Sequence, residues 1–188
     1  MGEVARGDLG RGESAPRRSL DVPGRSDLED SQRNLDSPWT AGPYSERARE
    51  WLKTNHNLVK ASVDRYDQLA REIAGREFVI THGEPHYGNL IRTEDGLHLI
   101  DWDTVALAPP ERDLWMLDEG TDESLRAYTE ATGHGIDRSA LEFYRLAWLV
   151  TDVASFTTEL RGPHNDDANS AHAWRALGIT GRILSSLL

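Results

Sequence analysis

One short segment in the middle of the chain restricts the fold more than any other feature. Residues 78–80 form an apolar run typical of a β-strand, and Pro85 then excludes a helix because proline fixes φ and has no N–H donor. Two further strand-like runs follow at 89–92 and 97–100, and they are joined through Asp95-Gly96, a pair that suits a tight hairpin turn. The segment therefore predicts a strand, a loop and a β-hairpin in that order.

The predicted loop and hairpin bring together three polar side chains. Glu84 lies in the loop, Asn89 begins the first hairpin strand, and Asp101 follows the second. Closing the hairpin places Asn89 beside Asp101, so that an amide and a carboxylate face one point, and oxygen ligands of this kind suit Mg²⁺. A phosphoryl-transfer site needs such a pair, together with a carboxylate that orients the attacking hydroxyl.

These residues carry a specific resemblance. The run that begins at His82 and contains Glu84 and Asn89, with the later pair Ile100-Asp101, resembles the Brenner motif of the aminoglycoside phosphotransferase family. That protein-kinase-like family carries His-Gly-Asp, a following asparagine, and Ile-Asp on the next strand. The resemblance implies that Glu84 is the catalytic carboxylate, that Asn89 and Asp101 bind Mg²⁺, and that ATP is the phosphoryl donor.

Three neighbouring residues are candidates for supporting roles. Asp113 lies in a segment, 109–115, that resembles the family region in which an aspartate before a leucine buttresses the catalytic loop. His82 is predicted to bridge backbone groups of the tight loop rather than to act on substrate. For Asp103 two alternatives stay open: a second metal contact, or a loop-capping or solvated role.

Glu84 stands where the family has an aspartate, which moves the carboxylate outward by about one C–C bond. Catalytic geometry responds to displacements of about 1 Å. Two alternatives therefore stay open, an active phosphotransferase and a catalytically incompetent binding lobe.

A different metal site is a rival interpretation of the same loop. His82, Glu84 and His86 alternate in a way that could place three ligands on one face of a strand, but Gly83 and Pro85 disfavour a regular strand. A zinc deaminase would require a Cys-x-x-Cys pair, and the chain contains no cysteine.

Charge and hydropathy narrow the classes of partner. The net charge of −11 disfavours a nucleic-acid binder and favours a cationic, amino-bearing ligand. A local acidic cluster could strengthen that field or could simply be a solvated face; its members are Asp118, Glu119, Asp122 and Glu123. The sequence has neither an apolar run long enough for a membrane span nor a signal peptide, so we expect a cytoplasmic protein without membrane contact.

The chain divides into two parts by composition. Residues 1–37 are rich in glycine and charge and contain no aromatic side chain, so we expect a largely disordered or loosely ordered connector. Residues 38–188 are predicted to form one lobe. Four of its helices are predicted at 45–52, 111–119, 123–132 and 172–187. A further helix carries apolar residues on one face from Val63 to Ile73 and is ended by Gly75. A long helical segment is opened by Ser139 and Glu142, which have the spacing of a capping box. Its tryptophans at 115, 148 and 174 are predicted core anchors.

The predicted fold class is α+β and mostly helical, like the large C-terminal lobe of a protein-kinase-like enzyme with a small catalytic hairpin. A nucleotide lobe would supply a lysine on a strand, whereas Lys53 and Lys60 both lie in helical surroundings. We therefore expect the N-terminal nucleotide lobe to be missing from this chain or separately encoded. The resemblance implies an ATP-dependent phosphotransferase acting on a hydroxyl of a small, aminoglycoside-like acceptor; the alternative is a truncated, incompetent binding or interaction lobe that self-associates.

Overall fold

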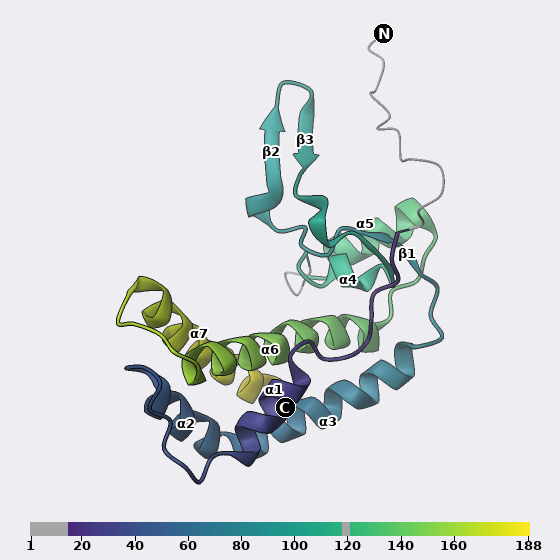
Figure 1. Ribbon diagram of the computed structural model, residues 1–188. Helices are drawn as coiled ribbons and strands as arrows, with labels where there is room; N and C mark the ends of the chain where they lie inside the picture. The colour runs from purple at the N-terminus through teal and green to yellow at the C-terminus, as the bar shows by residue number, and fades with distance from the viewer. Residues whose placement is uncertain (1–14, 118–120) are drawn as a thin grey trace.

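The computed structural model describes residues 15–117 and 121–188, and this part of the chain is mostly helical (Figure 1). Its α-helices are α1 (Arg25–Arg33), α2 (Ser45–Thr54), α3 (His56–Ile73), α4 (Glu111–Leu114), α5 (Glu123–Thr132), α6 (Arg138–Arg161) and α7 (Ala168–Leu187). Its strands are β1 (Val79–Thr81), β2 (Leu90–Thr93), β3 (Gly96–Leu99) and β4 (Ala106–Ala108). Two short 3₁₀ turns, Tyr87–Asn89 and Trp102–Thr104, flank the hairpin.

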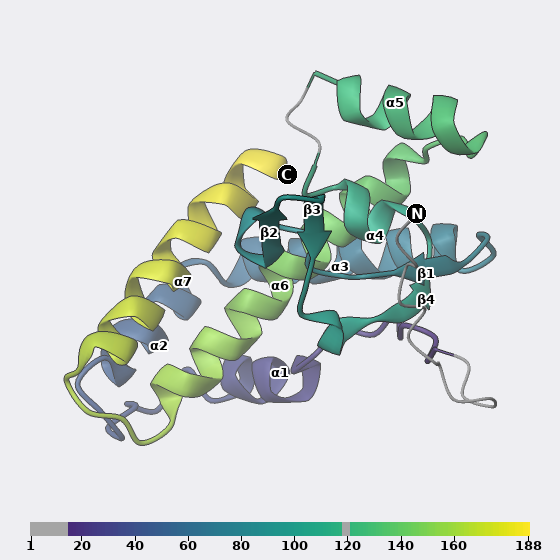
Figure 2. The ribbon, with the colours of Figure 1, turned by 90° about the horizontal axis from the view of Figure 1, so that it is seen from above.

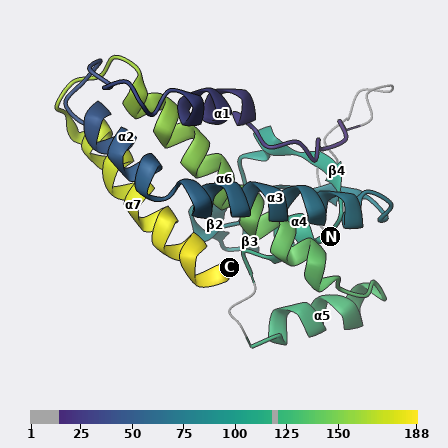
Figure 3. The ribbon, with the colours of Figure 1, turned by 90° about the horizontal axis from the view of Figure 1, so that it is seen from below.

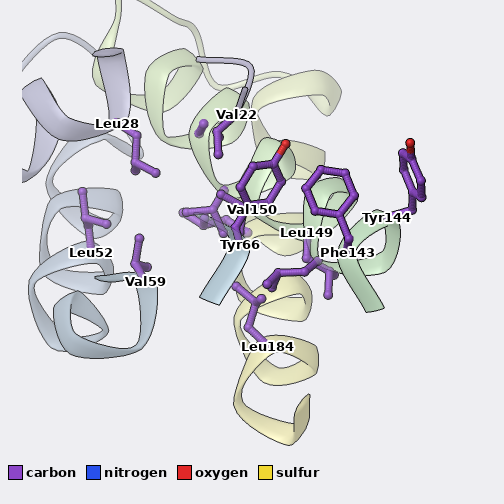
Figure 4. Close-up of a cluster of buried hydrophobic side chains, with 14 of the residues drawn as sticks. Val22, Leu28, Leu52, Val59, Tyr66, Phe143, Tyr144, Leu149, Val150 and Leu184 are labelled. Atoms are coloured by element: carbon purple, nitrogen blue, oxygen red, sulfur yellow. The ribbon is translucent and has the colours of Figure 1, made fainter. Parts of the chain in front are cut away.

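The core is organised around α6. This helix contacts α1, α2, α3, α4 and α7, and Figure 3 shows α7 alongside it and α3 crossing it. Such packing requires apolar side chains on nearly every face of α6, which the sequence supplies. Tyr66 of α3 and Phe143 of α6 meet with ring centroids 4.7 Å apart, and Leu149 and Val150 extend the same cluster (Figure 4).

The first turn of α6 differs from the prediction. Asp137 is the N-cap, and its Oδ1 accepts a hydrogen bond from the backbone N–H of Ser139 at 2.9 Å. Ser139 therefore lies inside the helix and does not cap it. Glu142, the predicted partner in a capping box, instead pairs with Arg65 of α3.

Residues 15–37 are more ordered than the predicted connector. They contain α1, and Leu28 on its inner face is only 1% exposed. Val22 and Leu35 are buried in the same core, while Arg161 of α6 hydrogen-bonds Asp30 and thereby lowers the pKa of that carboxyl. The prediction of loose order was wrong here because a few apolar residues, widely spaced among charges, all reach the core.

The strands form two separate two-stranded sheets. β1 pairs antiparallel with β4, from Val79 opposite Ala108 to Thr81 opposite Ala106. On the other edge of β4, Leu107 exchanges backbone hydrogen bonds with residues 16–18.

The predicted hairpin is confirmed. β2 pairs with β3, and the hairpin extends away from the helices (Figure 1) and is viewed nearly end-on in Figure 2. Its turn is formed by residues 94–95, and Gly96 has a φ of 132°, whereas Asp95 does not adopt positive φ.

The other helices test the predicted boundaries. The predicted α5 is confirmed from Glu123 to Thr132 and ends at Gly133, whose φ is 75°. The predicted helices at 45–52 and before Gly75 are also confirmed, although Ser45 does not cap α2: it lies in its first turn and donates its hydroxyl to the Leu160 carbonyl. α7 begins at Ala168, earlier than predicted, because Asp167 caps it. α4 ends at Leu114 instead of reaching 119.

Two further predictions need correction or restriction. Trp115 and Trp174 pack against the core, but Trp148 is 42% exposed and is not a core anchor.

Within the acidic cluster, Asp118 and Glu119 lie outside the described residues. Asp122 pairs with Arg138 at 2.6 Å, and this hydrogen bond lowers the pKa of Asp122. No helix in the described part is both long and apolar enough to span a bilayer.

Candidate active site

The loop after β1 is fixed by a single carboxylate. Asp113 in α4 accepts hydrogen bonds from the backbone N–H groups of His82 and Gly83, at 2.7 and 2.6 Å. One side chain thus satisfies two consecutive backbone donors that the turn leaves without strand partners. The family resemblance implied that Asp113 supports this loop, and in the structure the two are in contact.

His82 is 1% exposed, and both of its ring nitrogens contact backbone groups. Nδ1 accepts from the Glu84 N–H at 3.2 Å, and Nε2 lies 2.8 Å from the Ile100 carbonyl oxygen. Since Nδ1 accepts, the proton resides on Nε2, which donates to Ile100. The imidazole therefore ties the loop to the exit of the hairpin, in the backbone-bridging arrangement expected from the sequence.

Asn89 connects the loop to the start of the hairpin. Its Nδ2 donates to the Glu84 carbonyl at 2.9 Å, and its own carbonyl accepts from the Ile100 N–H at 2.9 Å. Because the amide nitrogen is committed to the loop, the side-chain oxygen is the end available for another ligand. The contact with Ile100 places Asn89 next to the chain that leads directly into Asp101.

Asp101 has an unusual backbone and a free side chain. Its φ of 62° and ψ of 66° lie in the left-handed region, which a non-glycine residue adopts only at a cost. Its side chain is exposed, and no hydrogen bond or ion pair to another described residue engages it. A strained backbone that presents an uncommitted carboxylate beside an available amide oxygen is a donor set that suits Mg²⁺.

Arg112 connects the residue before the loop to the turn that follows the hairpin. It is 7% exposed, and it donates to the Thr81 hydroxyl and to the Thr104 carbonyl, both at 2.8 Å. Burial lowers the pKa of its guanidinium. A Cβ at Gly83, which has a φ of 100°, would lie 2.1 Å from Arg112, so this position requires glycine.

The remaining candidates are less engaged. Asp103 is exposed within the turn Trp102–Thr104 and does not cap it through its side chain. Across the described residues, no group of three or more His, Cys, Asp and Glu side chains is arranged to hold a metal ion. The rival site built from His82, Glu84 and His86 is therefore not formed, because both nitrogens of His82 face backbone groups.

Glu84 lines a cavity of about 450 Å³, which we call the loop cavity. The loop contributes Gly83 and Glu84, and α6 contributes Trp148 and Asp152. Residues 18–19 and Pro23 line another part of it. Glu84 is half-buried, and its backbone N–H and carbonyl are both hydrogen-bonded, so its carboxylate is held at the boundary between loop and cavity.

Sequence reasoning missed Arg112, Trp148 and Asp152 as members of this region. Arg112 was visible only as the neighbour of Asp113. Trp148 and Asp152 are four residues apart and share one face of α6, a spacing that could have been noticed. Their position opposite the loop depends on tertiary packing.

Comparison with known proteins gives two matches in sequence. The profile of the family described as "Phosphotransferase enzyme family" matches residues 18–148. Protein StrN of Streptomyces griseus is 29% identical over 140 residues, which represent 72% of this chain and 41% of StrN.

Solved structures show the same fold. The spectinomycin phosphotransferase APH(9)-Ia in complex with ADP and spectinomycin superposes with a TM-score of 0.72 at 18% identity, over 92% of this chain and 57% of the other. The AMP-bound complex of that enzyme gives a TM-score of 0.70 at 19% identity, over 90% of this chain and 57% of the other. The chain thus spans less than two thirds of the length of the relatives that it matches.

Proposed function

Since this chain belongs to the phosphotransferase enzyme family, we propose that it takes part in ATP-dependent phosphoryl transfer to a hydroxyl of a small-molecule acceptor. The observation that carries this proposal is the hydrogen-bonded loop, which holds Glu84 at the loop cavity and Asn89 beside Asp101. A structural turn would not need an exposed, strained Asp101 without a protein partner.

In this proposal Glu84 orients the acceptor hydroxyl and accepts its proton. Asp113 keeps the loop in place through its two backbone hydrogen bonds, and His82 fixes the distance between the loop and the hairpin exit. Neither residue touches the acceptor. Both are positioning residues, because they act through the backbone on either side of Glu84.

Asn89 and Asp101 would hold Mg²⁺, with Asp103 as a further candidate contact. When bound, the metal ion neutralises the charge of the donor's phosphate oxygens. The chain contributes an amide oxygen that its own Nδ2 contact orients and a carboxylate that no described residue neutralises. The donor set therefore fits the ion.

The proposed large lobe of a kinase-like phosphotransferase comprises residues 38–188, and residues 15–37 with α1 pack into the same core. The proposed acceptor carries amino groups, in keeping with the net charge of −11. Spectinomycin is the ligand of the structural relative, and it serves here as a probe.

A second candidate, an incompetent binding or interaction lobe, is favoured by the exposed hairpin. Ile91 is 46% exposed and Leu97 is 60% exposed, although both lie on strands whose apolar side chains would normally be covered. Sedimentation analysis tests this candidate, since a self-associating chain without nucleotide affinity would support it.

The test of the main proposal is calorimetric titration of Mg·ATP into the purified chain and into two variants. Asp101→Ala removes the proposed metal ligand, and Asp95→Ala removes an exposed carboxylate from the hairpin turn as a matched control. Saturable binding that is lost only in Asp101→Ala supports the proposal. Absence of binding in the unmodified chain contradicts a self-sufficient nucleotide site and favours the second candidate.

A further inference from the structure

A groove between α2 and α7 lies away from the proposed catalytic site. It is a cavity of about 650 Å³, and its lining includes Trp51, Trp174, Gly178 and Arg182. The described residues that line it are all different from those of the loop cavity, and α2 lies at the opposite end of the lobe from β1 (Figures 1 and 2). Small-molecule sites have volumes of this size. We call this cavity the α2–α7 groove.

Two indoles border the groove, and part of each remains uncovered. Trp51 and Trp174 are half-buried, and Trp51 is fixed against the backbone of α7, since a Cβ at Gly181 would lie 2.5 Å from its Cζ2. In the described part of the chain, neither indole pairs with another aromatic ring, and neither indole N–H donates to a protein acceptor. The groove therefore offers two aromatic surfaces and two unused hydrogen-bond donors.

The α7 side of the groove carries positive charge that the protein does not neutralise. Arg175 and Arg182 line the groove, and neither forms an ion pair with a carboxylate of the described residues. α7 contains no acidic residue, although the whole chain has a net charge of −11. Arg182 folds back along the helix, so that one guanidinium nitrogen lies 3.8 Å from the position of a Cβ at Gly178. A guanidinium placed in this way can donate paired hydrogen bonds to a carboxylate or a phosphate.

The acids on the α2 side are already paired. Glu46 and Glu50 border the groove where it continues past Trp51, and Arg49 hydrogen-bonds both of them. The contact with Arg49 lowers the pKa of Glu46. The groove thus combines paired anions with cations that lack a partner, so its field favours an anionic ligand over a cationic one.

Gly178, in the middle of α7, leaves the groove open. Glycine destabilises a helix interior relative to alanine, so its presence there calls for a packing or functional reason. Trp51 supplies that reason for Gly181, but a Cβ at Gly178 would meet only Arg182 among the described residues, and only at an ordinary contact distance. The residue also lacks positive φ. Packing within the described protein therefore does not require glycine at 178, whereas a ligand beside Arg182 would use the space.

We propose that the α2–α7 groove binds a planar aromatic ring that carries a carboxylate or a phosphate. The ring lies against Trp51 and Trp174, and the anionic group pairs with Arg182. The proposal goes beyond the proposed function, because it requires neither Glu84 nor a bound metal ion. It gives the chain a second ligand site at a distance from the loop.

The test is calorimetric titration of the purified chain, without magnesium, with 1-naphthyl phosphate and 1-naphthoate. Two probes serve as controls: cyclohexyl phosphate lacks the planar ring, and 1-naphthol lacks the charge. We expect at least one naphthyl anion to bind about tenfold or more tightly than either control. The naphthyl anion that binds more tightly identifies whether the groove prefers a phosphate or a carboxylate.

Substitutions on α7 locate the bound probe. Arg182→Gln should reduce the preference for the naphthyl anion over 1-naphthol to about twofold or less. Trp174→Leu should do the same to the preference for 1-naphthyl phosphate over cyclohexyl phosphate. Gly178→Leu fills the groove and should weaken binding by about tenfold or more. Arg71→Gln is the matched control, because it removes an exposed arginine of α3 outside the groove, and it should leave both preferences intact. Thermal melting verifies that each variant folds.

Asp101→Ala separates this proposal from the proposed function. It should leave binding of the naphthyl anion unchanged, whether or not the unmodified chain binds Mg·ATP. Mg·ATP binding that Arg182→Gln loses and Asp101→Ala retains would place the nucleotide in the groove, which supports this proposal and contradicts the nucleotide site at Asp101.

Four results would overturn the groove as a ligand site. They are equal affinity for charged and uncharged probes, a preference that Arg182→Gln retains, loss of naphthyl anion binding in Asp101→Ala, and failure of both naphthyl anions to bind the unmodified chain at millimolar concentration.

Discussion

The loop of residues 82–88 and the hairpin that follows it are neighbours in sequence but differ in how they are held. In the loop, the backbone of residues 82–84 is hydrogen-bonded to Asp113, His82 and Asn89, and Arg112 packs against Gly83. In the hairpin, Ile91 and Leu97 remain exposed, and among the described residues β2 and β3 pair only with each other. The loop is therefore held by side chains of its own surroundings, whereas the hairpin presents exposed apolar side chains.

This difference has a physical consequence. An isolated two-stranded hairpin is marginally stable in water, so β2 and β3 depend on their attachment to the loop at Asn89 and Ile100. The loop depends instead on α4, which packs against α6. Substitutions that remove the contacts of Asp113 or Arg112 with the loop should therefore lower the free energy of unfolding much more than substitutions in the hairpin.

The largest expected effect comes from Asp113→Ala. It leaves the backbone N–H groups of His82 and Gly83 without their acceptor, and we expect the free energy of unfolding to fall by about 3 kcal/mol. Chemical denaturation measures this change. The matched variant Asp103→Ala removes an exposed carboxylate and should stay within about 0.5 kcal/mol of the unmodified chain. Equal effects of the two variants would contradict the role proposed for Asp113.

Gly83→Ala should have the next largest effect. The added methyl group meets Arg112, which two hydrogen bonds hold in place, and the φ of 100° is unfavourable for alanine. We expect a loss of about 2 kcal/mol in the free energy of unfolding. Gly135→Ala is a control, because a Cβ there meets no atom within 4 Å and the residue lacks positive φ. A neutral Gly83→Ala would show that Arg112 yields easily.

The ionisation of Asp152 makes the free energy of unfolding depend on pH. Desolvation raises its folded-state pKa above that of the unfolded chain, so folding takes up a proton between the two values. Stability attributable to this residue therefore falls as pH rises through the raised pKa, and it is recovered as pH falls. Asp152→Asn should remove this contribution and raise stability at neutral pH by less than about 1 kcal/mol, since solvent screens half of the group.

Thermal melting between pH 4 and 7 measures the difference between Asp152→Asn and the unmodified chain. The prediction is a stability gain that grows toward pH 7. A gain that grows toward pH 4 would mean that a cation within the chain pairs with Asp152.

The smallest effect on stability is expected in the hairpin. Leu97→Ser replaces a side chain that is 60% exposed, so the free energy of unfolding should change by no more than about 0.5 kcal/mol. If the hairpin mediates self-association, sedimentation should show a decrease in association for the same variant. A large loss of stability would mean that the hairpin surface is covered.

The same contrast explains what could be predicted from sequence. The hairpin and the loop depend on residues close together in the chain, such as Pro85 and Gly96, and their prediction was confirmed. The turn differs from the prediction, because residues 94–95 form it without positive φ at Asp95. The end of α5 was also predicted because Gly133 is a local signal for a helix end. In each case the determining residue lies within the element or next to it.

Other features depend on packing between distant segments. α1 was missed because Leu28 gains its burial from α6, more than a hundred residues later. The α6 cap was assigned to Ser139 because Asp137 and Ser139 are both good capping residues, and only the backbone geometry selects Asp137. Asp152 could not be recognised because its burial and its Thr180 partner come from the packing of α6 against α7.

Amide hydrogen exchange of the chain without ligands tests most directly whether the chain itself holds the loop that carries Glu84 in place. The account predicts that the amides of His82 and Gly83 exchange at least about 100-fold more slowly than those of the hairpin strands, and that Asp113→Ala abolishes this protection. Loop amides that exchange as fast as the hairpin amides in the unmodified chain would contradict it.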